Sequence, residues 1–156
     1  MQHSAGVLAS KLQQAMGQTR VGRYIKIKRE PRGVVITLEE AGFFDSGSAR
    51  LRDSSIGALE RLGRLLRDVG PIVRAEGHSD DQGTDASNWE LSAQRALALV
   101  RHWTAEVRFP PERLSAVGYG SHRPLVKEGT EEARARNRRV DLVVLSADTM
   151  REEPPR

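Results

Sequence analysis

The sequence contains no cysteine, and aromatic residues make up only 4% of its 156 positions. Without cysteine, disulfide bonds, thiolate nucleophiles, cysteine-bound zinc and lipid attachment through cysteine are excluded. No apolar run approaches the ~20 residues that a membrane-spanning helix needs. The net charge of +4 is compatible with an anionic partner but does not select one, and the few aromatic side chains argue against a nucleic-acid partner. The length fits one domain, because domains of roughly 100–200 residues are typical.

Strand and helix patterns alternate along the middle of the chain. Apolar and charged residues alternate over 24–28, and a turn at 30–33 joins this strand to a second one at 34–38. Regularly spaced leucines predict a helix that starts at Ser54 or Ser55 and ends at Gly70. The further expected elements are strands at 72–76, 114–117 and 140–145, and helices at about 88–105 and 130–136. This order predicts an α/β (α+β) fold, with a mixed sheet and helices packed on one face.

The two ends of the chain differ from this middle part. Residues 1–32 are expected to form a flanking segment with a weakly amphipathic helix and the first strand. Residues 33–146 are expected to form the main domain. Residues 147–156 are polar and end in Glu-Glu-Pro-Pro-Arg, which predicts a flexible tail.

The densest polar cluster, at 77–85, lies where a predicted strand ends and a helix is about to begin. Ligands of open α/β sheets favour this end of a strand. At 100° per residue, Asn88, Ser92 and Arg95 fall on one polar stripe of the next helix. Beside that stripe lies a second one, which we expect to face the core and which comprises Trp89, Ala93, Ala96, Val100 and Trp103.

Arg95 thus lies on the side where the preceding loop can fold back, and we expect Asp80 of the loop to face Arg95 across a short gap. Such a pair can bind a zwitterion, because the carboxylate accepts hydrogen bonds from an ammonium and the guanidinium donates two to a carboxylate. The alternative is an ordinary Asp80–Arg95 salt bridge without a ligand, worth ~0–1 kcal/mol at a surface. The arginine-rich segment 134–139 also allows two interpretations. It is either a solvated helix face, or Asn137 and Arg138 bind back to the Asp80 loop.

Four short motifs follow one another along the chain: Gly-His-Ser-Asp at 77–80, Asn-Trp-Glu-Leu-Ser-Ala-Gln-Arg-Ala at 88–96, Gly-Tyr-Gly at 118–120 and Asn-Arg-Arg-Val at 137–140. In this order they resemble the OmpA-like peptidoglycan-binding domain. The resemblance spans roughly residues 33–145 and implies the βαβαβ sandwich of that family. Within the family, segments 44–49 and 88–92 are most similar to MotB-type domains of flagellar motor stators.

The resemblance implies a ligand, the diaminopimelate of the peptidoglycan stem peptide. Asp80 would take its ammonium and Arg95 its carboxylate, while Asn88 would hold the loop. The remaining residues that would line or support the pocket are Ser79, Leu91 and Arg138. The family usually has threonine where this chain has Ser79, and the hydroxyl is kept.

The same resemblance implies a non-catalytic anchor with no cofactor and no metal. It implies a periplasmic location, a homodimer, and a membrane stator partner subunit in a full-length protein anchored in the inner membrane. The anchoring helix is not found in this sequence. An alternative within the family is an envelope anchor that is not part of a motor.

Two other classes of function remain open from the residues alone. A metal-dependent hydrolase could use His78, Asp80 and Asp81, although a structural, hydrogen-bonded histidine is the simpler interpretation of His78. A pure scaffold could dimerise through Trp103, Leu97 and Leu99, although such residues usually belong to a core.

Overall fold

The computed structural model describes residues 5–145, which form a sheet covered by helices. The strands are β1 (Ile25–Glu30), β2 (Gly33–Glu39), β3 (Ile72–His78), β4 (Leu114–Gly118) and β5 (Arg139–Leu145). The helices are α1 (Ala5–Gly17), α2 (Glu40–Phe43), α3 (Asp53–Val69), α4 (Asp85–His102) and α5 (Glu131–Asn137), with short helical turns at Gly22–Tyr24, Trp103–Val107 and Pro111–Arg113.

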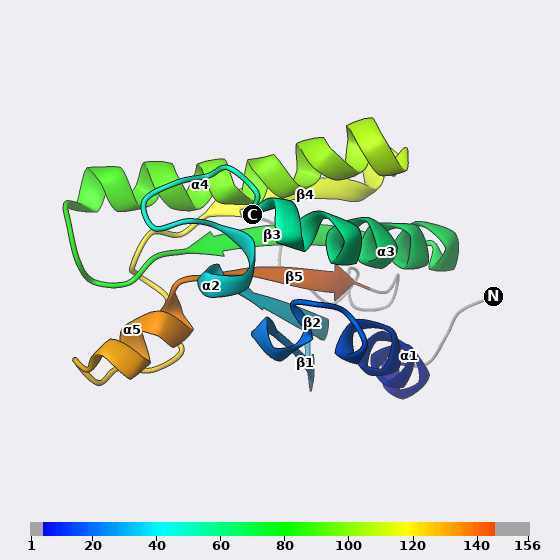
Figure 1. The fold of residues 1–156 in the computed structure, drawn as a ribbon, viewed down its shortest axis with the longest axis horizontal. Coiled ribbons are helices and arrows are strands. Elements are labelled where there is room, and N and C mark those ends of the chain that lie inside the picture. The colour runs from blue at the N-terminus through cyan, green and yellow to red at the C-terminus, as the bar shows by residue number, and fades with distance from the viewer. Residues whose placement is uncertain (1–4, 146–156) are drawn as a thin grey trace.

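The five strands form one mixed sheet in the order β1-β2-β5-β3-β4. Only β3 and β4 run parallel, and every other neighbouring pair is antiparallel. Strands β1 and β2 form the predicted hairpin, in which Glu30 pairs with Gly33. The last strand, β5, lies in the middle of the sheet between β2 and β3, as Figure 1 shows.

Helices α1, α3 and α4 cover one face of the sheet (Figure 1). Alternate strand residues point into this core, which is why Val34, Ile36 and Leu38 of β2 are buried with Val140 and Leu142 of β5. Helix α3 ends at Gly70, whose left-handed backbone (φ 96°) lets its N–H reach the carbonyl of Leu66. The predicted mixed sheet with helices on one face is confirmed.

Helix α4 packs very closely on β3 and β4. A Cβ atom at Gly77 would overlap the backbone of Ser92, and one at Gly118 would lie 2.7 Å from the Cβ of Ala93. Glycine at these two strand positions therefore lets the helix backbone approach the sheet. This contact fixes the first half of α4 over the carboxyl end of β3.

The prediction of the core face of α4 was wrong for its first turns. The buried residues of α4 are Ser92, Arg95, Ala96 and Leu99, whereas Trp89 is 42% exposed. Ala93 is exposed too, and Val100 is only half-buried, because the face of α4 that packs on β3 includes Ser92, whose backbone approaches Gly77. Helix α4 also starts three residues earlier than expected, and its first turn extends past the end of β3 (Figure 1).

The amino-terminal segment continues the same core. Leu8, Leu12 and Met16 of α1 are buried, and β1 extends the sheet beyond β2. The boundary between residues 32 and 33 stays a prediction, and the predicted tail at 147–156 lies outside the described residues. Within residues 5–145, no helix combines the length and the apolar character needed to cross a bilayer.

Candidate functional site

The loop between β3 and α4 holds Asp80 in a fixed position. Thr84 caps α4, because its Oγ1 accepts a hydrogen bond from the backbone N–H of Ser87 at 3.1 Å. Asn88 donates from Nδ2 to the carbonyl of Gln82 at 2.9 Å, which draws the loop onto the helix. The Oδ1 atom of Asp80 accepts from the N–H of Gln82 at 2.9 Å. The carboxylate is therefore oriented by its own loop.

The charge partner of Asp80 is Arg138, which lies between α5 and β5. Nη1 of Arg138 donates to Oδ2 of Asp80 at 2.8 Å, and Nε donates to Oε1 of Glu40 at 3.0 Å. Nη2 donates to Oε1 of Glu131 at 2.9 Å. Partial burial alone would lower the pKa of Arg138, but these acidic neighbours raise it above its usual value.

Of the two interpretations of segment 134–139, the one that ties it to the Asp80 loop is therefore confirmed for Arg138. Asn137 acts elsewhere. Its Oδ1 accepts from the N–H groups of Leu125 and Val126 at 2.8 and 3.0 Å.

Arg95 is buried and does not pair with Asp80. Its side chain is 3% exposed, and Nε and Nη2 donate to the carbonyls of Ser48 and Asp45 at 2.8 and 3.0 Å. Nη1 donates to Oε2 of Glu40 at 2.7 Å, and the guanidinium lies over the ring of Phe44. The predicted gap between Asp80 and Arg95 was wrong, because Arg95 lies on the buried stripe of α4 and points beneath segment 44–48.

Glu40 joins the two arginines, and the sequence analysis missed it. One oxygen accepts from Arg138 and the other from Arg95, so Asp80, Arg138, Glu40 and Arg95 form a continuous chain of ion pairs. We call these four residues the Glu40 cluster. Asp80 and Arg138 are partly exposed, with 13% and 23% of their side chains accessible, whereas Arg95 at the other end of the chain is buried. Two acids and two arginines balance their charges, which suits a ligand that carries both signs.

The other predicted site residues surround this cluster in different ways. Ser79 is buried, and its N–H donates to the carbonyl of Gly120 at 2.9 Å. Leu91 is half-buried in α4. Ser92, which was not predicted to belong to the site, accepts at Oγ from the N–H of Gly120 at 3.0 Å. These contacts join the loops that follow β3 and β4.

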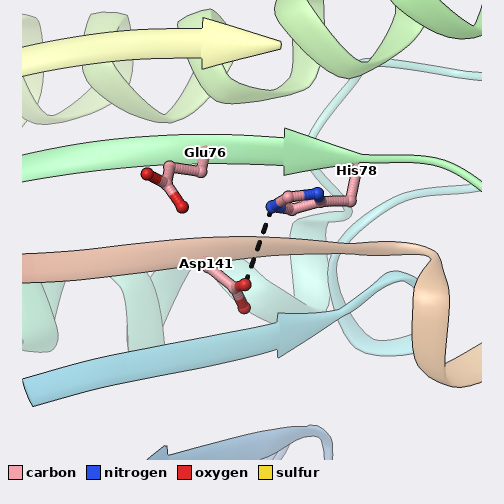
Figure 2. Close-up of side chains that lie close together, drawn as sticks. All are labelled: Glu76, His78 and Asp141. Carbon is pink, nitrogen blue, oxygen red and sulfur yellow. Dashed lines mark ion pairs between the residues drawn. The ribbon is translucent and has the colours of Figure 1, made fainter. Parts of the chain in front are cut away.

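A second polar cluster lies on the other side of the sheet. Figure 2 shows Glu76 and His78 of β3 beside Asp141 of β5, and one ligand atom from each lies within 4.8 Å of the others. The spacing could suit a metal ion, but both carboxylates already accept hydrogen bonds from arginines. Glu76 binds Arg32 and Arg74 at 2.9 Å, and Asp141 binds Arg139 at 3.1 Å. Three arginines against two carboxylates oppose a cation, so this cluster fits a layer of buried ion pairs better.

The hydrolase hypothesis requires His78, Asp80 and Asp81 to act together, and the structure gives them different partners. His78 is buried near Asp141, Asp80 binds Arg138, and exposed Asp81 binds Arg134 at 3.2 Å. His78 was expected to be hydrogen-bonded. Instead its ring stacks on Tyr119, and neither ring nitrogen has a hydrogen-bond partner among the described residues.

Burial, together with the positive charges of the nearby Arg139, Arg32 and Arg123, lowers the pKa of His78 to about 3. The unfolded chain therefore binds a proton near pH 6.5, which the folded protein takes up only near pH 3. We expect the free energy of unfolding to fall by up to about 1.4 kcal/mol per pH unit as the pH drops through this window. Urea unfolding of the wild type and of His78→Phe, which keeps a ring against Tyr119, measures the slope. Equal slopes in the two proteins between pH 6 and pH 4 would contradict the assignment.

Comparison with known proteins gives consistent results. The model of the OmpA family matches residues 43–138. Motility protein B of Bacillus subtilis is 28% identical over 87% of the chain, and the chain spans about half the length of the curated relatives it matches. A MotB-like protein from Desulfovibrio vulgaris has a similar structure (TM-score 0.80, 25% identity, 90% of this chain and 93% of that one). So does the cell wall anchor of the T6SS from Pseudomonas aeruginosa (TM-score 0.76, 28% identity, 86% and 96%).

Proposed function

This chain belongs to the OmpA family and has a MotB-type fold, and on that basis we propose that it is a non-catalytic peptidoglycan-binding module. Its ligand is the diaminopimelate of the stem peptide. Its task is to anchor a flagellar motor stator to the cell wall. The observation that carries the proposal is the Glu40 cluster, which holds the partly exposed carboxylate of Asp80 next to guanidinium groups.

Binding of a zwitterion follows from the chemistry of this cluster. The ammonium of the ligand takes the place of the Arg138 Nη1 atom at Asp80, where it meets a carboxylate that the loop already orients. Arg95 has five N–H donors and uses one on each of its three nitrogens, so two N–H groups remain for a carboxylate. Because Arg95 is covered by segment 44–48, the ligand carboxylate must approach between that segment and α4. Asn88 and Ser79 keep the loop in place, and Leu91 and Arg138 border the pocket.

The cellular setting is part of the same proposal. A motility protein and a MotB-like protein among the relatives favour a stator, whose periplasmic part resists torque only when fixed to the rigid wall. Each zwitterion contact is modest, so a homodimer with two linked sites would hold far better through effective concentration. A membrane partner subunit and an inner-membrane anchor would then belong to the full-length protein.

A second candidate is an envelope anchor outside the flagellar motor. It is favoured by the likeness to the T6SS cell wall anchor, which is 28% identical and matches over 86% of this chain. A chimeric stator protein that carries this domain in place of its own wall-binding domain distinguishes the two. Restored swimming supports the motor, whereas wall binding without restored swimming supports the second candidate.

The chemistry of the ligand is tested with two kinds of purified cell wall. We expect the protein to sediment with walls whose stem peptide carries diaminopimelate. With walls that carry lysine at this position, we expect at least about fivefold weaker binding, because lysine lacks the side-chain carboxylate and one charge-assisted contact is lost. Equal sedimentation with both walls would show that the carboxylate is not recognised.

A further inference from the structure

Trp89 lies on the surface, in the first turn of α4, and is held there by polar neighbours. Its indole Nε1 donates to Oδ2 of Asp85 at 3.2 Å, and its ring stacks on His122 with centroids 5.0 Å apart. Nε2 of His122 lies 2.7 Å from Oδ1 of Asp85, which closes the set. We call Trp89, Asp85 and His122 the Trp89 platform.

The conformation of the chain around the platform keeps the indole in one orientation. Gly120 has a left-handed backbone (φ 59°), and a Cβ atom at this glycine would lie 3.4 Å from Cδ2 of Trp89. The loop after β4 therefore lies directly against the indole. Three neighbours hold a ring that remains 42% exposed, so the ring loses little conformational entropy when a ligand covers it.

The fold does not need this aromatic ring for its core. The other tryptophan, Trp103, is buried and donates its indole N–H to the carbonyl of Leu59 at 2.8 Å. Among the large exposed apolar residues of the described part of the chain, Trp89 alone is aromatic. A rigid, exposed indole flanked by a carboxylate and an imidazole is suited to a flat ligand with an apolar face and a polar edge.

The platform lies beside the proposed stem-peptide pocket. Asn88 precedes Trp89 and closes the Asp80 loop, and Ser92 binds the backbone of Gly120, which touches the indole. The pocket and the platform thus border the same loop, 79–84. In peptidoglycan, each stem peptide is attached to a strand of N-acetylated hexopyranose rings, so a bound peptide brings such rings close to the domain.

We propose that the Trp89 platform is a saccharide subsite that takes one N-acetylated hexopyranose ring of the glycan strand. The C–H face of the sugar stacks on the free part of the indole. Its hydroxyl and acetamido groups exchange hydrogen bonds with Asp85 and His122. This inference rests on the proposed peptidoglycan binding and adds a second point of contact to it.

The probe is a tetramer of N-acetylglucosamine, which carries no peptide. We expect the indole N–H resonance of Trp89 to shift during its titration, while that of buried Trp103 stays in place. We also expect Trp89→Ala to bind purified diaminopimelate walls at least about fivefold more weakly than the wild type. Its affinity for a free diaminopimelate stem peptide should be unchanged. Leu97→Ala is the matched control, since Leu97 is 40% exposed on the same helix, and should behave as the wild type.

The proposal is overturned if the Trp89 resonance does not move at millimolar tetramer, or if Trp89→Ala retains wild-type wall binding. These results are distinct from a failure of the stem-peptide pocket. That failure would appear as full wall binding by Asp80→Asn, whatever the tetramer does to Trp89.

Discussion

Asp80→Asn is expected to weaken binding of the protein to purified diaminopimelate walls about 10- to 100-fold. The substitution keeps the shape of the side chain and removes its charge, so the ligand ammonium loses a charge-assisted hydrogen bond worth about 1.5–3 kcal/mol. Stability should change little, because the asparagine oxygen can still accept from Arg138, which also keeps its ion pairs with Glu40 and Glu131. Sedimentation with cell walls measures the affinity, and urea unfolding measures the stability.

The neighbouring residue supplies the control. Asp81→Asn removes the same charge one position along the chain, from a side chain that is exposed and binds Arg134 instead of Arg138. It should leave wall binding within about twofold of the wild type. If the two variants weaken binding equally, the effect comes from the general charge of the loop, and the assignment of Asp80 to the ammonium is wrong.

Arg95→Ala is expected to affect both the fold and the ligand site. The alanine leaves the carbonyls of Asp45 and Ser48 without their donors and takes one of two arginines from Glu40. We expect a loss of about 2–4 kcal/mol in the free energy of unfolding, together with loss of wall binding. Arg101→Ala, an exposed arginine on the same helix, should change stability by less than about 0.5 kcal/mol.

The two roles of Arg95 can be separated with a conservative variant. Arg95→Lys keeps the positive charge near Glu40 but cannot donate in a fork to a carboxylate. We expect Arg95→Lys to recover most of the stability that Arg95→Ala loses. Its wall binding should still be at least about tenfold weaker than that of the wild type. Wild-type wall binding by Arg95→Lys would show that Arg95 only holds segment 44–48 in place.

The fold was predictable because the decisive signals are local. The alternation of apolar and charged residues in 24–28 predicts a half-buried strand. Gly70 marks the end of α3, because its left-handed backbone closes the helix. Each of these signals depends on a few neighbouring residues, so no knowledge of distant contacts is required. The resemblance of four ordered blocks then fixed how the elements assemble.

The site was only partly predictable, because its partners are distant in sequence. Glu40 and Arg138 are 98 residues apart, and Arg95 reaches Ser48 across 47 residues. A helical wheel places Arg95 on a stripe but cannot show that segment 44–48 covers it. The one available signal for Glu40 was an acidic pair directly after a predicted strand, and in isolation that pair has no evident partner.

The place of β3 in the sheet also bears on mechanical strength. The loop with Asp80 leaves the end of β3, and β3 is hydrogen-bonded to β5 on one side and to β4 on the other. Tension on that loop, directed along β3, loads both rows of inter-strand hydrogen bonds in shear, so many backbone hydrogen bonds must break together. An edge strand under the same pull would be held by one row of backbone hydrogen bonds instead of two. The proposed wall anchor would thus take its load at one of the strongest points of the sheet.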